Sequence, residues 1–410
     1  MKLIGPYSQL LTMRDMPLRG ALKDEQLGII EKAGLVVDES KIIAVGRFEE
    51  LRKAFREAVV HEISQPQLAM PGLVDAHTHL CYAGSRAMDF ASRNAGISYQ
   101  EIAAAGGGIW SSVRHTRAAS QEALTQGILE RLSQMIGWGV TTVEIKSGYG
   151  LSVEAELKQL RAIQAARSQT PLELVATCLA AHIVPRDFEG GEKEYLKMIL
   201  HELVPTIQKE GLAERFDAFV EENAYSAKLA GPYLEVLKGS GFGICLHGDQ
   251  FSTGGSELAV ALGALSVDHL EASGEREIEL LSKSQVIPMA LPGATLGLGC
   301  GFTPARKLLD AGCSLAIASD WNPGSAPMGD LLTQASILAT FEKLSTAEVL
   351  AGLTFRAAAA LDRAHLGRLE AEYQADWISF STDDYREILY HQGRMKPAQV
   401  WKKASVISLK

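Results

Sequence analysis

The sequence predicts an α/β protein: a (β/α)8 TIM-type barrel plus a small β-sandwich domain built from both chain termini. Two observations predict this fold class. Apolar runs of strand length alternate with longer segments of helical periodicity through the middle of the chain, and both ends contain only short strand-like stretches. With 410 residues, 47% of them hydrophobic, the chain can bury a large core.

The two ends of the chain resemble each other and differ from the middle. Residues 1–67 contain short apolar stretches such as GLVVDES and KIIAVGRF, and residues 368–410 contain ADWISFS, EILYH and AQVWKK. Neither end has enough apolar residues to bury a core alone. We therefore expect the ends to pair into one composite β domain, with the barrel formed by residues 68–367.

Eight continuous apolar runs in the middle of the chain are typical of buried parallel strands. They lie at residues 72–77, 141–146, 172–182, 215–222, 242–247, 264–270, 285–291 and 314–320. Eight strand–helix units over roughly 290 residues fit a closed barrel. An open doubly wound sheet is the alternative, but it would place a glycine-rich phosphate turn after the first strand, where the sequence reads GLVDAHTHL.

The link between the first two strands, residues 83–140, is unusually long and includes AAAGGGIW. A link of this length usually forms a lid or an inserted helical piece. Its glycine run, Gly106–Gly108, fits a hinge or an anion-binding backbone nest, and equally well a plain flexible turn.

The composition limits the partners and the compartment. The net charge of −9 has no long charged run behind it, so no basic footprint for nucleic acid is present. No apolar run reaches about 18 residues and the N-terminus lacks an apolar signal segment, which argues against a membrane or secreted protein. Five cysteines without CxxC spacing favour free buried thiols in a reducing compartment. We expect a cytoplasmic protein, with a homodimer as the commonest oligomer.

Polar residues gather where the predicted strands end. Catalytic groups of a barrel come from the C-terminal ends of several strands, which closure brings to one face. The residues at these ends are His77 and His79, His182, His247 with Gln250, Asp268 with His269, and Asp320.

Four of these residues together predict a metal site: His77, His79, His247 and Asp320. Residues i and i+2 of a strand face the same way, so His77 and His79 can both point into the barrel mouth. Three imidazoles and one carboxylate leave room for water and suit a catalytic divalent metal, zinc or iron. Taken singly, His247 also fits a hydrogen-bonded core histidine, and Asp320 a helix N-cap. All four at strand ends favour the metal.

The same residues stand in motifs that resemble the amidohydrolase superfamily: PGLVDAHTHL at the first strand, CLHGDQ at the fifth, VDHLE at the sixth and IASDWNPGS at the eighth. Within it, the chain is similar to the imidazolonepropionase family through AGSRAMDF (83–90), EIKSGYGL (144–151), AAHIVP (180–185) and SDWNPGS (319–325). The resemblance spans nearly the whole chain. It implies a mononuclear metal in a (β/α)8 barrel flanked by a β-sandwich.

The resemblance also implies a reaction and the residues that perform it. The reaction is hydrolysis of 4-imidazolone-5-propanoate to N-formimidoyl-L-glutamate in histidine degradation, by attack of metal-bound water. The metal ligands would be His77, His79, His247 and Asp320. The substrate-binding residues would be Arg86, Tyr149, His182, Gln250, Asn322, Gly324 and Ser325.

Elementary chemistry agrees with several of these roles. The substrate carries a propanoate, and the guanidinium of Arg86 can hold a carboxylate through two hydrogen bonds, although a surface ion pair is the plainer alternative. Tyr149 can donate a phenol hydrogen bond or simply pack in the core. His182 can polarise the scissile carbonyl or satisfy a backbone partner.

Gln250 stands where deaminase-like amidohydrolases often carry a glutamate that acts as general base. Glutamine cannot take up a proton, but it can bind a ring amide with both donor and acceptor. We therefore expect Asp320 or His269 to carry the proton to the leaving nitrogen, although His269 equally fits a purely supporting hydrogen bond.

The sequence favours one metal per subunit and leaves two other functions open. Binuclear amidohydrolases use a modified lysine at the end of the fourth strand, where this chain reads FVEEN. Zinc and iron suit the same ligands, so the ion stays open. A related amidohydrolase that deaminates a purine or pyrimidine-type ring would usually need the acid that Gln250 replaces. A non-catalytic barrel paralogue would usually lose metal ligands.

Overall fold

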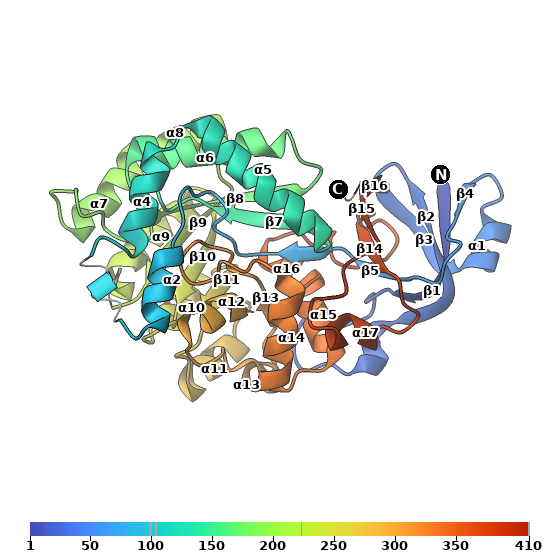
Figure 1. Ribbon diagram of the computed structural model, residues 1–410. Helices are drawn as coiled ribbons and strands as arrows, with labels where there is room; N and C mark the ends of the chain where they lie inside the picture. The colour runs from blue at the N-terminus through green and yellow to red at the C-terminus, as the bar shows by residue number, and fades with distance from the viewer. Residues whose placement is uncertain (98–100, 103–104, 223, 409–410) are drawn as a thin grey trace.

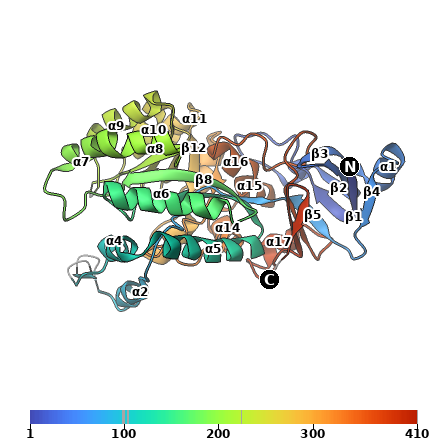
Figure 2. The same cartoon turned by 90° about the horizontal axis from the view of Figure 1, so that it is seen from above.

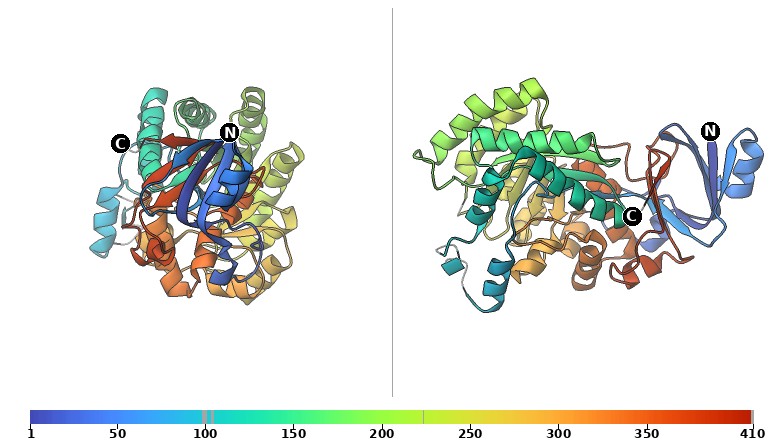
Figure 3. Two further views of the ribbon diagram at one scale, coloured as in Figure 1. Left: turned by 90° about the vertical axis from the view of Figure 1, so that its right-hand side faces the viewer. Right: turned by 45° about the horizontal axis from the view of Figure 1, so that its top comes forward.

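The computed structural model describes residues 1–97, 101–102, 105–222 and 224–408. It consists of a helix-covered barrel and a smaller β domain beside it, which contains both chain termini (Figure 1). The view from above and the right-hand view of Figure 3 show the same elongated arrangement, with the barrel at one end and the small sheet at the other (Figures 2 and 3). In the left-hand view of Figure 3 the small sheet lies in front of the barrel.

Eight parallel strands form the barrel sheet, in chain order from β6 to β13. They are β6 Leu73–Asp75, β7 Val140–Lys146, β8 Glu173–Ala181, β9 Arg215–Val220, β10 Gly243–Gly248, β11 Ser266–His269, β12 Ile287–Ala290 and β13 Ala316–Ile317. A parallel bridge between Thr78 and Trp321, just beyond β6 and β13, joins the first strand to the last. Each strand overlaps one predicted range and extends beyond it by at most one residue, so the predicted barrel is confirmed.

Helices follow the barrel strands along the chain and cover the outside of the barrel (Figure 1). The side chains of β7 are buried without exception, as expected for a strand with helices outside and side chains inside the barrel. Serine N-caps start two of the helices, because Ser120 and Ser152 accept hydrogen bonds from the backbone N–H of Ala123 and Ala155. The helices around the barrel are α5 Gln121–Gly137, α6 Val153–Arg167, α7 Glu192–Met198, α8 Val204–Glu210, α9 Ala227–Gly239, α10 Gly255–Leu262, α11 Glu275–Ser282, α12 Pro292–Leu298, α13 Ala305–Asp310, α14 Leu331–Glu342, α15 Thr346–Gly352 and α16 Phe355–Ala360.

The small domain is one mixed sheet with strands from both ends of the chain. Its order is β16-β15-β14-β5-β1-β2-β3, and β4 pairs with the start of β1. Its core is shared by both halves of the sheet, and there Trp377 stacks on Trp401 and donates from Nε1 to the Tyr7 hydroxyl. The predicted sandwich from both termini is therefore one continuous sheet folded over its own core. The strands are β1 Lys2–Leu11, β2 Ile29–Asp38, β3 Lys41–Arg47, β4 Val59–Glu62, β5 Leu68–Pro71, β14 Trp377–Phe380, β15 Gln399–Lys402 and β16 Ser405–Ile407, with α1 Phe48–Ala54 and α17 Arg386–Tyr390 beside them in the chain.

The change from the small domain to the barrel occurs at β5. This strand pairs with β1 and β14 and so belongs to the small sheet, although residue 68 is the predicted start of the barrel. We propose Gly72 as the first boundary on the basis of this pairing. On the C-terminal side, Leu369 lies in the core of the small domain, next to the proposed boundary at 368.

The segment between β1 and β2 leaves the small sheet and packs on the barrel. Arg19 donates hydrogen bonds to the backbone carbonyls of Ser282 at 2.6 Å and Gly312 at 3.1 Å. Arg356, a buried residue of α16, donates to the carbonyl of Gly20 at 2.7 Å. The two domains are thus joined by arginines that bind backbone carbonyls across the interface.

The long link between β6 and β7 contains α2 Ala87–Asn94, α4 Ile109–Ala118 and α5, so it is an inserted helical piece. Its glycine run packs against α2. Gly106 and Gly108 have positive φ angles of 88° and 71°. A Cβ on Gly107 would lie 2.6 Å from Oδ1 of Asp89, and the N–H of Gly108 donates to Oδ2 of Asp89 at 2.8 Å.

The cysteines and the helices bear on the predicted compartment. All five cysteines are free thiols, and four of them are buried. Within the described ranges, no helix has both the length and the apolar character needed to cross a membrane.

Candidate metal centre and active site

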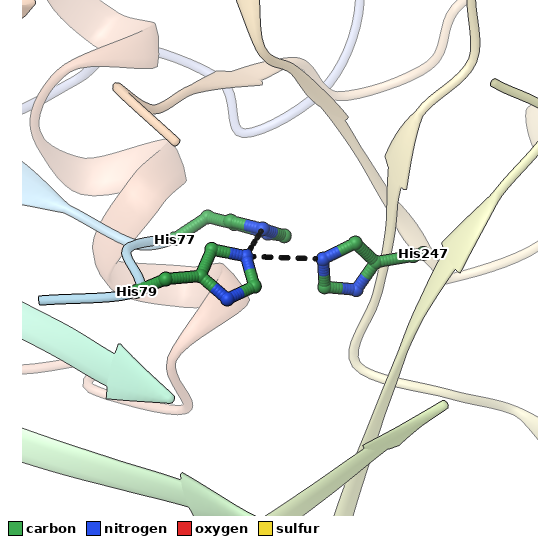
Figure 4. Close-up of side chains that lie close together, drawn as sticks. All are labelled: His77, His79 and His247. Carbon is green, nitrogen blue, oxygen red and sulfur yellow. Dashed lines mark hydrogen bonds between the residues drawn. The ribbon is translucent and has the colours of Figure 1, made fainter. Parts of the chain in front are cut away.

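The four predicted ligands converge at the C-terminal edge of the barrel. His77 and His79 follow β6, His247 lies near the end of β10, and Asp320 follows β13. All four side chains are buried, and the three imidazoles point toward one another (Figure 4). The backbone N–H of Asp320 donates to the carbonyl of His77 at 3.0 Å, which fixes the fourth residue beside the first at the barrel closure.

The distances between the ligand atoms suit a tetrahedral metal site. Nε2 of His79 lies 3.3 Å from Nε2 of His77 and 3.3 Å from Nε2 of His247. Oδ1 of Asp320 lies 3.3 Å from Nε2 of His79 and 3.5 Å from Nε2 of His77. Bonds of about 2.0–2.1 Å to a tetrahedral zinc ion would separate neighbouring ligand atoms by about 3.3 Å. The three histidines therefore form a site for a divalent metal. Asp320 lies against two of them, His77 and His79.

Two buried aspartates support the other ring nitrogens. Oδ2 of Asp268 lies 2.6 Å from Nδ1 of His77. Oδ2 of Asp217 lies 2.9 Å from Nδ1 of His247. Oδ1 of Asp217 also accepts a hydrogen bond from the backbone N–H of His247 at 3.1 Å. Carboxylates in these positions fix the ring orientation and leave Nε2 for the metal.

The charges of the metal-free site are set by burial and by these contacts. Burial raises the pKa of Asp320, but hydrogen bonds with His77 and His79 outweigh it and hold the pKa well below the ordinary value. Burial lowers the pKa of His79 and of His247. Burial also lowers the pKa of His77, but hydrogen bonds to Asp268 and Asp320 raise it to about 9 overall. A metal that binds here would therefore displace a proton from His77, while the other three ligands already have the required charge.

His182 and Tyr149 lie beside His79. The ring of His182 stacks on that of His79 with centroids 5.7 Å apart, and the Tyr149 ring lies 5.9 Å from His79. Burial lowers the pKa of His182 to about 3 and raises that of Tyr149. Nδ1 of His182 lies 3.0 Å from the carbonyl of Gly148, so Nδ1 carries the proton of the neutral ring. Nε2 of His182 is then an acceptor, whereas polarising a carbonyl would require a donor.

Arg86 lines a cleft formed in part by the loop that follows Asp320. The cleft, of about 360 Å³, is lined by Tyr82, residues 84–87, Phe90, Arg131, Pro323, Gly324 and Pro327. A Cβ on Gly324 would lie 2.9 Å from Nη1 of Arg86, so the arginine packs against the loop that follows Asp320. Arg86 also donates from Nε to Asp89.

Asn322 and Ser325 shape the loop that follows Asp320. The side-chain oxygen of Asn322 accepts hydrogen bonds from the N–H groups of Gly324 at 2.7 Å and Ser325 at 2.8 Å. Its side-chain nitrogen donates to the carbonyl of Asp320 at 2.7 Å and to Oγ of Ser325 at 2.9 Å. The polar atoms of Asn322 are thus engaged within the loop, so this residue places Gly324 and Ser325 relative to Asp320.

Gln250 follows β10, and His269 ends β11 beside two of the ligand histidines. The loop of Gln250 is held by Glu221, which accepts from the backbone N–H groups of Gln250 at 2.7 Å and Ser252 at 3.0 Å. The ring centroid of His269 lies 5.3 Å from that of His247 and 6.0 Å from that of His77. His269 has a positive φ of 88°, which turns the chain sharply at the end of β11.

The sequence analysis missed several residues that support the site. Glu144 and Asp217 lie inside apolar strands and Lys146 is the last residue of β7, and all three are fully buried. The signal was present in TTVEIK and RFDAFVEE, where charged residues interrupt runs that are otherwise typical of buried strands. Asp89, which holds Arg86, was hidden in a helix that looks ordinary in the sequence.

The chain is similar in fold to solved hydrolases and deaminases. The atrazine chlorohydrolase of Arthrobacter aurescens complexed with zinc matches with a TM-score of 0.70 and 17% identity, over 99% of this chain and 95% of that chain. An adenosine deaminase from Xanthomonas campestris with bound zinc matches with a TM-score of 0.71 and 19% identity, over 98% of this chain and 92% of that chain. At these identities the likeness establishes the fold.

Proteins similar to this chain in sequence have a higher identity to it than these solved structures. Residues 219–407 match the model of the Amidohydrolase family. The imidazolonepropionase of Chloroflexus aggregans is 38% identical over 99% of this chain and 98% of its own length. The imidazolonepropionase of Deinococcus radiodurans is 40% identical, over 96% of this chain and 96% of its own length. Likeness at this level over the full length of both proteins shows that the chain belongs to the imidazolonepropionase family.

Proposed function

We propose that the protein hydrolyses the ring amide C–N bond of 4-imidazolone-5-propanoate and forms N-formimidoyl-L-glutamate. The observation that carries this proposal is the position of Arg86, whose guanidinium packs against the loop that follows Asp320, together with the cluster of three histidines. A metal centre supplies hydrolysis, and a guanidinium beside it supplies a partner for the propanoate. Membership of the imidazolonepropionase family supports the same substrate.

We propose one divalent metal per subunit, zinc or iron, held by His77, His79, His247 and Asp320. The close approach of the three histidine Nε2 atoms and of Oδ1 of Asp320 to His77 and His79 supports this assignment. The charge of the site supports it too, because the Asp320 carboxylate has a low pKa and the His79 and His247 imidazoles are kept neutral, which are the forms that bind cations. When bound, such an ion polarises a carbonyl and lowers the pKa of water.

The propanoate group would be held by Arg86. A guanidinium can bind a carboxylate through two parallel hydrogen bonds, which fixes both the position and the orientation of the substrate. Gly324 suits this arrangement because a side chain there would collide with Nη1 of Arg86. Ser325, whose Oγ and N–H are placed by Asn322, lies next to Gly324 in the loop and can contribute to substrate binding.

The substrate ring would lie between Arg86 and the histidine cluster. His182 is neutral with its acceptor nitrogen free, so we propose that Nε2 accepts a hydrogen bond from a ring N–H of the substrate. Tyr149 keeps its phenol proton because burial raises its pKa, and it can donate a hydrogen bond. Gln250 would contribute an amide that both donates and accepts.

Proton transfer would fall to Asp320 or His269. Asp320 lies within the ligand cluster and is held ionised by His77 and His79, so it can accept a proton from an attacking water. His269 borders the same cluster beside His247 and His77. Either residue can then return the proton to the leaving nitrogen of the opened ring.

Turnover of freshly generated 4-imidazolone-5-propanoate, followed by loss of its ring absorbance, tests the proposal. A panel of purine and pyrimidine amines serves as the competing substrate class. The proposal expects turnover of the imidazolone alone. Activity confined to the amines would identify a deaminase instead and would overturn the assignment.

The Arg86→Met variant tests how the substrate is held. We expect KM for the imidazolone to rise by about a hundredfold, because removal of a charge-assisted bidentate contact weakens binding by about 3 kcal/mol. Arg276, which pairs with Glu257 on the exposed surface, provides the matched control Arg276→Met, with unchanged KM. An unchanged KM in Arg86→Met would exclude Arg86 as the carboxylate partner.

We propose the cytoplasm as the compartment and a homodimer as the assembly. The five free thiols support a reducing compartment. Light scattering of the purified protein measures the assembly directly, and a mass of one chain would contradict the dimer.

A further inference from the structure

A chain of buried ions runs through the barrel interior below the metal centre. The ammonium of Lys146 lies 2.8 Å from Oε1 of Glu144 and 2.9 Å from Oδ2 of Asp217. All three side chains have no exposed surface. Glu144 and Lys146 lie on β7 and Asp217 lies on β9, so the lysine bridges two strands that are separated by β8.

The two ends of this ion chain reach different halves of the metal site. At one end, Oε2 of Glu144 accepts a hydrogen bond from the backbone N–H of Thr78 at 3.2 Å. Thr78 stands between His77 and His79, and its hydroxyl also donates to the backbone carbonyl of Glu144 at 2.6 Å. Glu144 therefore fixes the short segment that carries both of these histidines.

At the other end, Asp217 holds His247 at two points. Oδ1 accepts from the backbone N–H of His247, and Oδ2 lies 2.9 Å from Nδ1 of its ring. The same Oδ2 atom also faces the ammonium of Lys146. Lys146 thus pairs directly with both the carboxylate that supports His247 and the carboxylate that supports the His77–His79 segment. The buried Arg215 also interacts electrostatically with Glu144 and Asp217.

A buried ion triad is not explained by stability alone, because removing three charges from water is costly and apolar residues often stabilise a core at least as well. A purely structural triad could lie anywhere in the barrel interior. This one contacts the ligand-bearing segments at both ends. Carboxylates that orient metal-binding histidines commonly change metal affinity by about ten- to a hundredfold when altered.

We propose that Lys146 is a positioning residue of the metal centre: it joins Glu144 to Asp217 and so sets the separation between the His77–His79 pair and His247. This inference rests on the metal-centre part of the proposed function and is independent of the substrate. Without the ammonium, the two carboxylates repel each other, and the two halves of the ligand set lose their common anchor.

The test compares Lys146→Met with Lys402→Met in the full-length protein. Lys402 is the matched control, since it is a buried lysine paired with Asp376 at 2.6 Å and Glu173 at 3.5 Å, outside the metal site. Zinc affinity is measured by chelator competition after metal removal, and the coordination geometry by the visible spectrum of the cobalt-loaded protein. Thermal unfolding measures the general cost of removing a buried lysine.

We expect Lys146→Met to bind zinc at least tenfold more weakly than the parent and to show an altered cobalt spectrum. Lys402→Met should keep the parent affinity within twofold and the parent spectrum, although its melting temperature also falls. A folded Lys146→Met protein with parent-like zinc affinity and spectrum would overturn the proposal. A parent protein that binds no divalent metal would overturn the metal centre itself, which distinguishes the two failures.

If Lys146→Met does not fold, a second pair of variants tests whether the ion chain positions the metal ligands. Glu144→Gln keeps the side-chain shape and an oxygen for the Thr78 N–H, but it removes the charge that faces Lys146. Glu348→Gln is its control, a buried glutamate that binds Arg306 far from the ligands. We expect zinc affinity to fall severalfold in Glu144→Gln alone, and equal affinities in both variants would contradict the role of the ion chain.

Discussion

His77 and His247 each use one ring nitrogen for support and leave the other for a metal. Their Nδ1 atoms face Asp268 and Asp217, while their Nε2 atoms both approach Nε2 of His79. A carboxylate behind an imidazole fixes its tautomer and makes it a better ligand. The chemistry of the site therefore depends on residues that never touch the metal.

His182 shows what burial does to a histidine without a carboxylate partner. Burial lowers its pKa to about 3, so the folded chain keeps the ring neutral where the unfolded chain takes up a proton, below about pH 6.5. A group that binds fewer protons when folded lowers stability as the pH falls. His182 should thus destabilise the fold progressively on acidification from about pH 6.5 towards pH 3.

We expect His182→Gln to lose less stability on acidification than the parent protein. Between pH 7 and pH 5 the parent should lose about 1–2 kcal/mol more, because only its unfolded state gains the extra proton at residue 182. Urea unfolding of metal-free protein at both pH values measures this difference. His201, an exposed histidine, provides the control His201→Gln, and equal losses in parent and His182→Gln would contradict the assignment.

At the scale of elements, the inserted link between β6 and β7 places Arg86 at the start of α2. Asp89, one turn later, binds Nε of Arg86 and the N–H of Gly108. The glycine run is needed there because Gly107 packs directly on Asp89 and Gly106 and Gly108 have positive φ angles. The link thus fixes the guanidinium that we propose as the substrate anchor.

The Asp89→Asn variant should loosen this anchor without changing the chemistry. We expect KM to rise by about tenfold and kcat to stay within about threefold, because the asparagine no longer fixes the guanidinium by charge. Steady-state kinetics on the imidazolone separate the two constants. Asp38→Asn, which removes an exposed pair with the N-terminal amine, is the control. A fall in kcat at unchanged KM would show that Asp89 acts on the reaction in another way.

The sequence was sufficient for the barrel elements because buried parallel strands leave an unbroken apolar signal. The convergence of His77, His247 and Asp320 was predictable too, since barrel closure brings strand ends together. The charges of Asp217 and Lys146 stand out within apolar runs, but their roles were not predictable, because these residues become functional only through contacts between strands far apart in the chain. The roles of Asn322 and Asp89 depend on loop geometry, which apolar periodicity does not encode.

At the scale of the whole molecule, the small domain and the barrel are joined by the segment that leaves β1. Arg19 reaches three backbone carbonyls of the barrel, those of Ser282, Ser284 and Gly312. Arg356, which belongs to the barrel, donates a hydrogen bond to the carbonyl of Gly20 in that segment. None of these contacts involves a proposed site residue, so they bear on stability rather than on the reaction.

We expect Arg19→Met to lower the free energy of unfolding by about 1–3 kcal/mol, because charged hydrogen bonds to three carbonyls are lost. At saturating substrate its kcat should match that of the parent. Urea unfolding and steady-state kinetics measure the two quantities. Arg14→Met removes a nearby exposed arginine and should change neither. A large loss of kcat in folded Arg19→Met would show that the interface controls the site.

We propose that His77, His79, His247 and Asp320 hold one divalent metal on which hydrolysis depends. Titration of metal-free protein with zinc or ferrous iron, with turnover of 4-imidazolone-5-propanoate measured at each step, tests this metal dependence. We predict that activity rises linearly and levels off at one equivalent per chain, and that His247→Ala shows no such rise. Full turnover by protein shown to be free of metal would contradict the account.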